Sequence, residues 1–188
     1  MTRKQQAITS REVIHASAVL DVNSHTAFSK FTDPREIRAW LIDPFGGGTV
    51  DIEARAGGKF ELFWNAPGGK QEGTPGCTIT VFEPPRLLGF NWKGPTEVAD
   101  PMNRGDPLTH VTVTFVPLPE GARARTAVEL VHSGWGSSEA FQAGRAYFES
   151  AWTSAFGNLE SICRRSGRAR GRARRGAEGP RVKGRAER

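Results

Sequence analysis

Residues 137–163 constrain the fold more than any other stretch, because their apolar side chains recur at alternating steps of three and four. This spacing places them within about one third of the circumference of an α-helix, with polar residues opposite. Ser137 or Ser138 can cap the first turn, since a serine oxygen accepts a hydrogen bond from a free amide. The predicted buried face comprises Phe141, Arg145, Phe148, Trp152, Ala155, Phe156, Leu159 and Cys163. A long amphipathic helix of this kind needs a second layer to cover it.

The preceding chain supplies that layer as segments in which apolar and polar residues alternate. Such alternation is typical of β-strands, and the short Gly- and Pro-containing turns between consecutive segments make them antiparallel. Between the first two strands the pattern predicts two short helices, capped at Asn23 or Ser24 and at Asp33. The predicted strands lie at 12–20, 49–54, 59–64, around 77–81 and 88–92, and at 109–116 and 126–132, with an irregular loop at 94–107.

This order of elements predicts an α+β fold, with an antiparallel sheet of about six to seven strands whose inner face packs on the long C-terminal helix. We expect one domain over residues 11–163, and disordered segments at 1–10 and 164–188. Residues 164–188 hold eleven Lys and Arg side chains and two Glu side chains, a net charge of +9, although the whole chain carries only +6. The stretch is almost without apolar residues, so burial cannot offset its ordering entropy.

The basic pI therefore belongs to the tail, and the domain itself is mildly acidic, at −3. Clustered Lys and Arg near phosphates give salt-sensitive binding that does not depend on base sequence. Weak contact of residues 164–188 with nucleic acid or acidic surfaces is one interpretation of the tail. A solvated extension without function is the other, because no aromatic residues are interleaved for base stacking.

Cys77 and Cys163 give neither a disulfide framework nor a metal-binding spacing, and we expect both to be buried in a reducing compartment. Residues 1–10 lack the apolar core of a signal peptide, and no segment approaches the ~20 apolar residues of a membrane helix. These features predict a cytoplasmic protein. No cofactor or metal ion is expected.

Several short strings, in this order, resemble those of a known family. The chain resembles the SRPBCC (Bet v 1/START-like) superfamily, and within it the bacterial proteins similar to the C-terminal domain of the activator of Hsp90 ATPase, over about residues 12–163. The resemblance implies a helix-grip fold, in which a curved antiparallel sheet wraps a long C-terminal helix and leaves a cavity. It also implies ligands such as lipids, sterols or polyketides. The strings are Phe31-Thr32-Asp33-Pro34 with Trp40, Ala56-Gly57-Gly58-Lys59-Phe60, Glu83-Pro84-Pro85-Arg86-Leu87, Phe90-Asn91-Trp92, Val131-His132-Ser133-Gly134 and Ala151-Trp152 with Leu159.

Ala151 departs from this pattern, because the family often has glycine before the tryptophan. A methyl group at this position could narrow the cavity.

Large apolar residues predicted to face the helix could line an apolar ligand site or could simply fill a core. Arg145 is charged yet lies on the apolar stripe, so it could bind a carboxylate or phosphate, or extend to water over its aliphatic stem. His132 could be a polar pocket group, a titrating base or a structural histidine. The candidate ligand-binding residues are Phe60, Leu62, Trp64, Phe90, Trp92, His132, Phe141, Arg145, Phe148 and Trp152.

Motifs for hydrolytic, phosphate-binding or metal chemistry are not apparent in the sequence. The preferred hypothesis is a non-enzymatic protein that binds a small hydrophobic or amphipathic ligand between sheet and helix. A cyclase or isomerase with His132 as base is the second, and it needs His132 to face an open cavity. A chaperone-associated interaction protein is the third.

Overall fold

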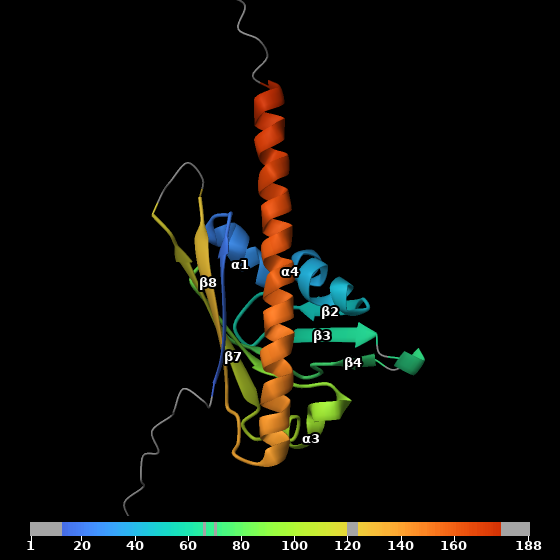
Figure 1. The fold of residues 1–188 in the computed structure, drawn as a ribbon. Helices are drawn as coiled ribbons and strands as arrows, with labels where there is room; N and C mark the ends of the chain where they lie inside the picture. Colours follow the sequence, from blue (N-terminus) through green and yellow to red (C-terminus); the bar gives the residue numbers. More distant parts are fainter. Residues whose placement is uncertain (1–12, 66, 70, 120–123, 178–188) are drawn as a thin grey trace, which may run out of the picture.

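The computed structural model describes residues 13–65, 67–69, 71–119 and 124–177, and its long C-terminal helix lies against a twisted antiparallel sheet (Figure 1). The five-stranded sheet has the order β1-β8-β7-β6-β5, and a second, three-stranded sheet has the order β2-β3-β4. The strands are β1 (Ile14–Leu20), β2 (Gly48–Ile52), β3 (Phe60–Asn65), β4 (Gln71–Gly73), β5 (Ile79–Glu83), β6 (Leu87–Trp92), β7 (Thr109–Pro117) and β8 (Thr126–Ser133). The predicted α+β helix-grip architecture, with a curved sheet around the C-terminal helix, is confirmed.

The number of strands differs from the prediction, since the described residues form eight strands in two sheets. The strand that sequence analysis missed is β4, whose three residues, Gln71–Gly73, are too few to show alternation. The two sheets meet where Lys59 pairs with Thr78 in an isolated antiparallel bridge. Pairing between β5 and β6 shifts its register between Ile79 and Val81. A bulge of this kind changes which side chains face inward, and beyond it Phe82 packs on Phe28 in the core.

The long helix α4 spans Glu139–Ala177. Its start agrees with the predicted cap, because the Ser138 hydroxyl accepts a hydrogen bond from the Phe141 amide at 3.4 Å. The predicted stripe is buried from Phe148 to Cys163, whereas Phe141 and Arg145 are partly exposed. The helix thus covers the inner face of the sheet with its apolar side.

We predicted a disordered segment from residue 164, whereas the helix α4 extends to Ala177. Arg and Ala make up most of residues 164–177, and both are strong helix formers. Extending an existing helix by one residue is also far easier than starting one. Residues 178–188 and 1–10 lie outside the described residues, so the predictions made for them stay predictions.

Four short helical segments follow β1 and lie beside the middle of α4 (Figure 1): α1 (Ser24–Thr32), α2 (Pro34–Ile37), η1 (Arg38–Ile42) and η2 (Asp43–Phe45). The Asn23 side chain caps α1 by accepting from the Thr26 amide at 2.8 Å, and Asp33 caps α2. Trp40 in η1 is fully buried and donates its indole N–H to the carbonyl of Lys30 at 2.8 Å. Both caps lie where the sequence predicted them.

Residues 94–107 are not the irregular loop we predicted, because they contain η4 (Thr96–Val98) and α3 (Ala99–Met102). The side chain of Asn103 closes this segment by bonding both the amide and the carbonyl of Gly94, each at 2.7 Å. Met102 is buried. A segment held by the Asn103 hydrogen bonds and by one buried residue shows no periodic pattern of apolar residues, so its helical turns could not be predicted from the sequence.

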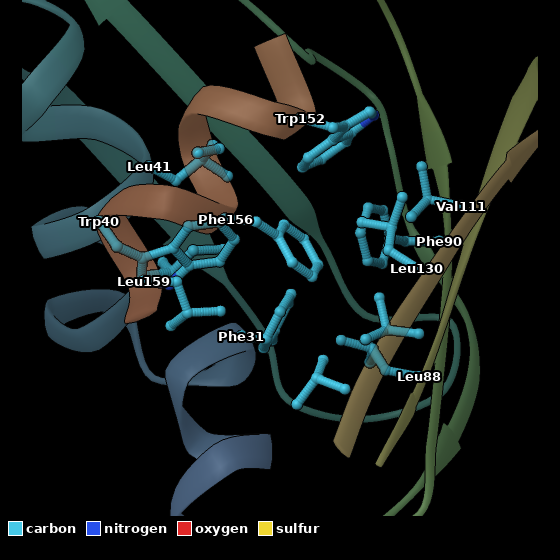
Figure 2. Packing of buried hydrophobic residues seen from close by; sticks show 14 of the residues in the cluster. Phe31, Trp40, Leu41, Leu88, Phe90, Val111, Leu130, Trp152, Phe156 and Leu159 are labelled. Carbon is cyan, nitrogen blue, oxygen red and sulfur yellow. The ribbon is translucent and has the colours of Figure 1, made fainter. Parts of the chain in front are cut away.

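The core between α4 and the sheet is filled by interlocking rings and aliphatic side chains (Figure 2). Phe31 contacts Trp40, Phe115 and Phe156 at ring-centre distances of 4.9, 5.3 and 6.3 Å. Phe60 from the smaller sheet stacks on Phe90 from the larger one at 4.0 Å. Within the described part of the chain, no helix combines the length and apolarity needed to span a membrane.

Candidate functional site

His132 lies on β8 at the centre of a buried hydrogen-bond network that joins sheet to helix. The Trp152 indole of α4 donates to Nδ1 of His132 at 3.2 Å, and His132 Nε2 lies 3.0 Å from the Thr109 hydroxyl. The Thr109 hydroxyl in turn donates to the carbonyl of Trp92 at 3.0 Å. Since Nδ1 accepts, the proton of the neutral ring is on Nε2. We call Trp152, His132, Thr109 and Trp92 the His132 network.

His132 is fully buried, and burial, reinforced by the charge of His110, lowers its pKa to about 3. The imidazole therefore stays neutral across the physiological range. A general base must reach the proton it removes, but both nitrogens of this ring are already hydrogen bonded. The geometry that the cyclase or isomerase hypothesis required of His132 is therefore not present.

An open pocket lies beside this network, near the first turns of α4. Its volume is about 330 Å³. Four elements border it: the end of the η1–η2 segment, the edge of the smaller sheet, the chain after β6, and α4. We call it the aromatic pocket, and it is lined by Leu41, Phe45, Trp64, Asn65, Glu72, Gly73, Trp92, Lys93, Pro95, Glu97, Tyr147, Phe148, Ala151 and Trp152.

The structure brings only part of the predicted ligand-binding set to this pocket. Trp64, Trp92, Phe148 and Trp152 line it. Phe60, Leu62, Phe90 and His132 are instead packed in the core, with exposed fractions of 1% or less. Phe141 and Arg145 are partly exposed on α4 and do not line it.

Arg145 bonds within its own helix. Its Nε donates to the side-chain oxygen of Gln142 at 3.2 Å, and its guanidinium lies 3.8 Å from the carboxylate of Glu149. The side chain is 22% exposed, so the structure agrees with the alternative in which its stem covers apolar surface and its head reaches water.

Sequence analysis missed the polar residues and the rim of the pocket. Glu72 lies on the short strand β4, and Glu97 lies on η4, neither of which was predicted. Tyr147 follows the polar face of α4 by helical angle and is 45% exposed, so periodicity alone places it away from the core. Phe45 forms part of the rim and is 41% exposed. Ala151, singled out because of its methyl group, does line the pocket.

Trp64 and Trp92 form the wall opposite α4. The Trp64 indole is fixed by donating to the carbonyl of Leu41 at 3.0 Å. Trp92 packs against Trp64 and Trp152 at ring-centre distances of 6.2 and 5.1 Å. Its indole N–H is buried without a hydrogen-bond partner among the described residues, a state that costs about 1–3 kcal/mol.

Groups of His, Cys, Asp and Glu that could hold a metal ion are absent from the described residues. Cys77 and Cys163 are buried free thiols, as predicted, and burial raises the pKa of Cys77 to about 11 and also raises the pKa of Cys163. Neither thiol is therefore in the reactive thiolate form near neutral pH.

Comparisons with known proteins identify a family and solved structures that are similar to this chain. Residues 21–164 match the model of the family described as activator of Hsp90 ATPase homolog 1-like protein. Solved structures with the same fold include proteins from Nitrosomonas europaea (14% identity, TM-score 0.65, covering 85% of this chain and 98% of that one) and Arthrobacter aurescens (19%, 0.64, 85% and 90%). The Aha1 dimer from Colwellia psychrerythraea also matches (12%, 0.56, 80% and 95%). No curated protein matches.

At these identities the structural neighbours establish the fold alone, whereas the family model spans most of the chain. That span contains the pocket, the His132 network and the packed part of α4. The chain belongs to the family of activator of Hsp90 ATPase homolog 1-like proteins.

Proposed function

We propose that this protein binds a small hydrophobic or amphipathic molecule in the aromatic pocket. The observation that carries the proposal is the open space of about 330 Å³ beside Trp64, Trp92 and Trp152. Ligand sites are concave, mostly apolar and about 300–1,000 Å³ in volume, with a few polar groups that orient the ligand. The pocket has these properties, since aromatic walls surround a small number of polar side chains.

The His132 network supports this function by holding the pocket wall in place. Trp152 and Trp92 both line the pocket, and the network ties the Trp152 side chain and the Trp92 backbone to the sheet. Rings whose positions are fixed before binding lose little conformational entropy when a ligand arrives. A ligand with an acceptor close to the Trp92 N–H would also satisfy that donor.

Native mass spectrometry tests the proposal. The full chain is incubated separately with pools of lipids, sterols and aromatic polyketides, and adducts are counted for each variant. Ala151 lines the pocket, so Ala151→Trp should fill it and abolish adducts. Ala146→Trp, on the exposed side of the same helix, is the matched control and should bind as the unmodified protein does.

Circular dichroism of both variants checks that the fold is retained. The expected result is adducts with the unmodified protein and Ala146→Trp, and none with Ala151→Trp. The absence of adducts from every pool, or adducts that persist in a folded Ala151→Trp protein, would contradict binding at this site.

The family match favours a second candidate function, contact with an Hsp90-type chaperone. Such contact would use an outer surface and would not need the pocket. Co-purification with the Hsp90 homologue of the same cell tests it, and Ala151→Trp should leave the interaction unchanged. If no complex forms with the purified homologue, this candidate is removed and the ligand-binding proposal is unaffected.

A further inference from the structure

We infer that the aromatic pocket selects an amphipathic cation, with an amine or quaternary ammonium head group on an apolar body. This inference rests on the ligand-binding function proposed above and names the class of ligand. It reverses the expectation from the sequence, in which Arg145 would hold an anion, because Arg145 does not line the pocket and two carboxylates do.

The walls of the pocket suit a cation because they are built mainly from aromatic rings. The π face of an aromatic ring carries partial negative charge, and Trp attracts a cation best. Trp92 packs against both Trp64 and Trp152, at ring-centre distances of 6.2 and 5.1 Å, and all three rings line the pocket. Because each of the three rings borders the open space, each can present part of its surface to one compact, weakly hydrated ammonium group.

Two carboxylates at the rim add negative potential to the same space. Glu72 projects from β4 and Glu97 from η4, on elements adjacent at this end of the molecule, since Glu72 accepts a hydrogen bond from the Thr96 amide at 3.0 Å. Their field extends across the pocket to α4. Burial raises the pKa of Tyr147, and the charges of Glu97 and then Glu72 raise it further.

One lining residue carries the opposite charge. Lys93 donates from its ammonium group to the carbonyl of Pro75 at 2.6 Å. Because that carbonyl lies outside the set of lining residues, the hydrogen bond draws the charge toward the β4–β5 connection. The ionised lining residues, Glu72, Glu97 and Lys93, give the pocket a net charge of −1. No described arginine lines it.

The experiment compares three probes with the same alkyl chain, decyltrimethylammonium, 1-decanol and decyl sulfate, each below its micelle-forming concentration. Binding to the full chain is followed by titration calorimetry and by tryptophan fluorescence, to which the five indoles of the chain contribute and three of which line the pocket. The test variant is Glu72→Gln/Glu97→Gln, in which the amide oxygen at 72 can still accept from Thr96. The matched control is Glu149→Gln, which removes an exposed carboxylate of α4 that does not line the pocket.

The expected result is that the ammonium probe binds at least tenfold more tightly than 1-decanol, and decyl sulfate most weakly. The double variant should lose about tenfold in affinity for the ammonium probe and less than twofold for 1-decanol, whereas Glu149→Gln should change neither. Raising the salt concentration should reduce the preference.

Two outcomes separate the two proposals. If 1-decanol or decyl sulfate binds as tightly as the ammonium probe, the pocket binds ligands but does not select cations, and only the inference made here is wrong. If none of the three probes binds, the proposed function fails and this inference fails with it. A preference for the cation that is undiminished in the double variant would overturn the role of Glu72 and Glu97.

Discussion

The helix α4 borders two interiors that differ in how completely they are filled. Along Ala155–Cys163 it packs against α1, η1 and the larger sheet, where Phe156 lies 6.3 Å from both Phe31 and Trp40. Along Tyr147–Trp152 it borders the aromatic pocket. The amino acids are of the same type in both places, so the difference comes from what faces them. Two continuous layers close the first region, whereas the second meets the edge of a three-stranded sheet and a short helical rim.

The comparison indicates that large rings do not by themselves make a cavity or a core. In the closed region rings from helices and strands interlock at close distances, and Phe31, Trp40, Phe115 and Phe156 do not line the aromatic pocket. In the open region Trp92 contacts both Trp64 and Trp152, and an open pocket remains beside the three rings. Mutations in the two regions should therefore have different consequences.

The largest expected difference is in stability. Phe156→Ala in the closed region should lower the free energy of unfolding by about 3–5 kcal/mol, since it leaves a void among fixed neighbours. Phe45→Ala at the rim, where the ring is 41% exposed, should cost less than about 1 kcal/mol. Urea unfolding monitored by circular dichroism measures both. Equal losses would show that the two regions are not packed differently.

A second prediction concerns how the free energy of unfolding depends on pH through His132, which lies beside the aromatic pocket. Burial lowers the pKa of His132 to about 3 from the usual 6.5, so below pH 6.5 the unfolded state binds a proton that the folded state does not. The free energy of unfolding should therefore decrease as the pH is lowered, by about 2–3 kcal/mol from pH 6.5 to pH 4.5.

Urea unfolding of the unmodified protein and of His132→Gln at several pH values isolates this contribution. His132→Gln lowers stability at every pH, but its dependence on pH should be shallower by that amount. Parallel curves for the two proteins would mean that His132 titrates normally in the folded state.

A third prediction tests whether the His132 network holds the pocket wall. Thr109→Val removes the acceptor of the His132 proton with little change in shape and should cost about 1–2 kcal/mol. Thr112→Val, on the opposite face of the same strand, is the control and should cost less than about 0.5 kcal/mol. Thermal unfolding measures both, and a ligand that binds the pocket should also bind Thr109→Val more weakly. Unchanged ligand affinity would show that the His132 network does not hold the pocket wall in its binding position.

The smallest expected effect belongs to the residue that stood out most in the sequence. Arg145→Gln should change stability by less than about 0.5 kcal/mol, because its ion pair with Glu149 is largely exposed on the Glu149 side. It should change the affinity of any pocket ligand less than twofold. Calorimetry with the decyl probes checks this. A larger loss of affinity would show that Arg145 contributes to ligand binding.

Sequence periodicity was sufficient for the longer strands, for the packed part of α4 and for most of the core. The alternation of β7 and β8 and the stripe from Phe148 to Cys163 are buried as predicted, because these elements each pack one side against a single large layer. The site was harder to predict. Four of the ten candidate residues, Trp64, Trp92, Phe148 and Trp152, line the pocket, and periodicity could not separate them from Phe60 and Phe90, which face the same way but are packed.

The sequence by itself determined that one amphipathic helix would be wrapped by an antiparallel sheet, because helix and strand periods are local properties of the chain. Only the tertiary structure decided where the wrapping is incomplete and which charges lie there. Glu72 and Glu97 come from short elements without a periodic pattern, and they reach the pocket because strand β4 and the β6–β7 connection lie side by side there. That meeting depends on contacts between residues far apart in the sequence, which no local pattern encodes.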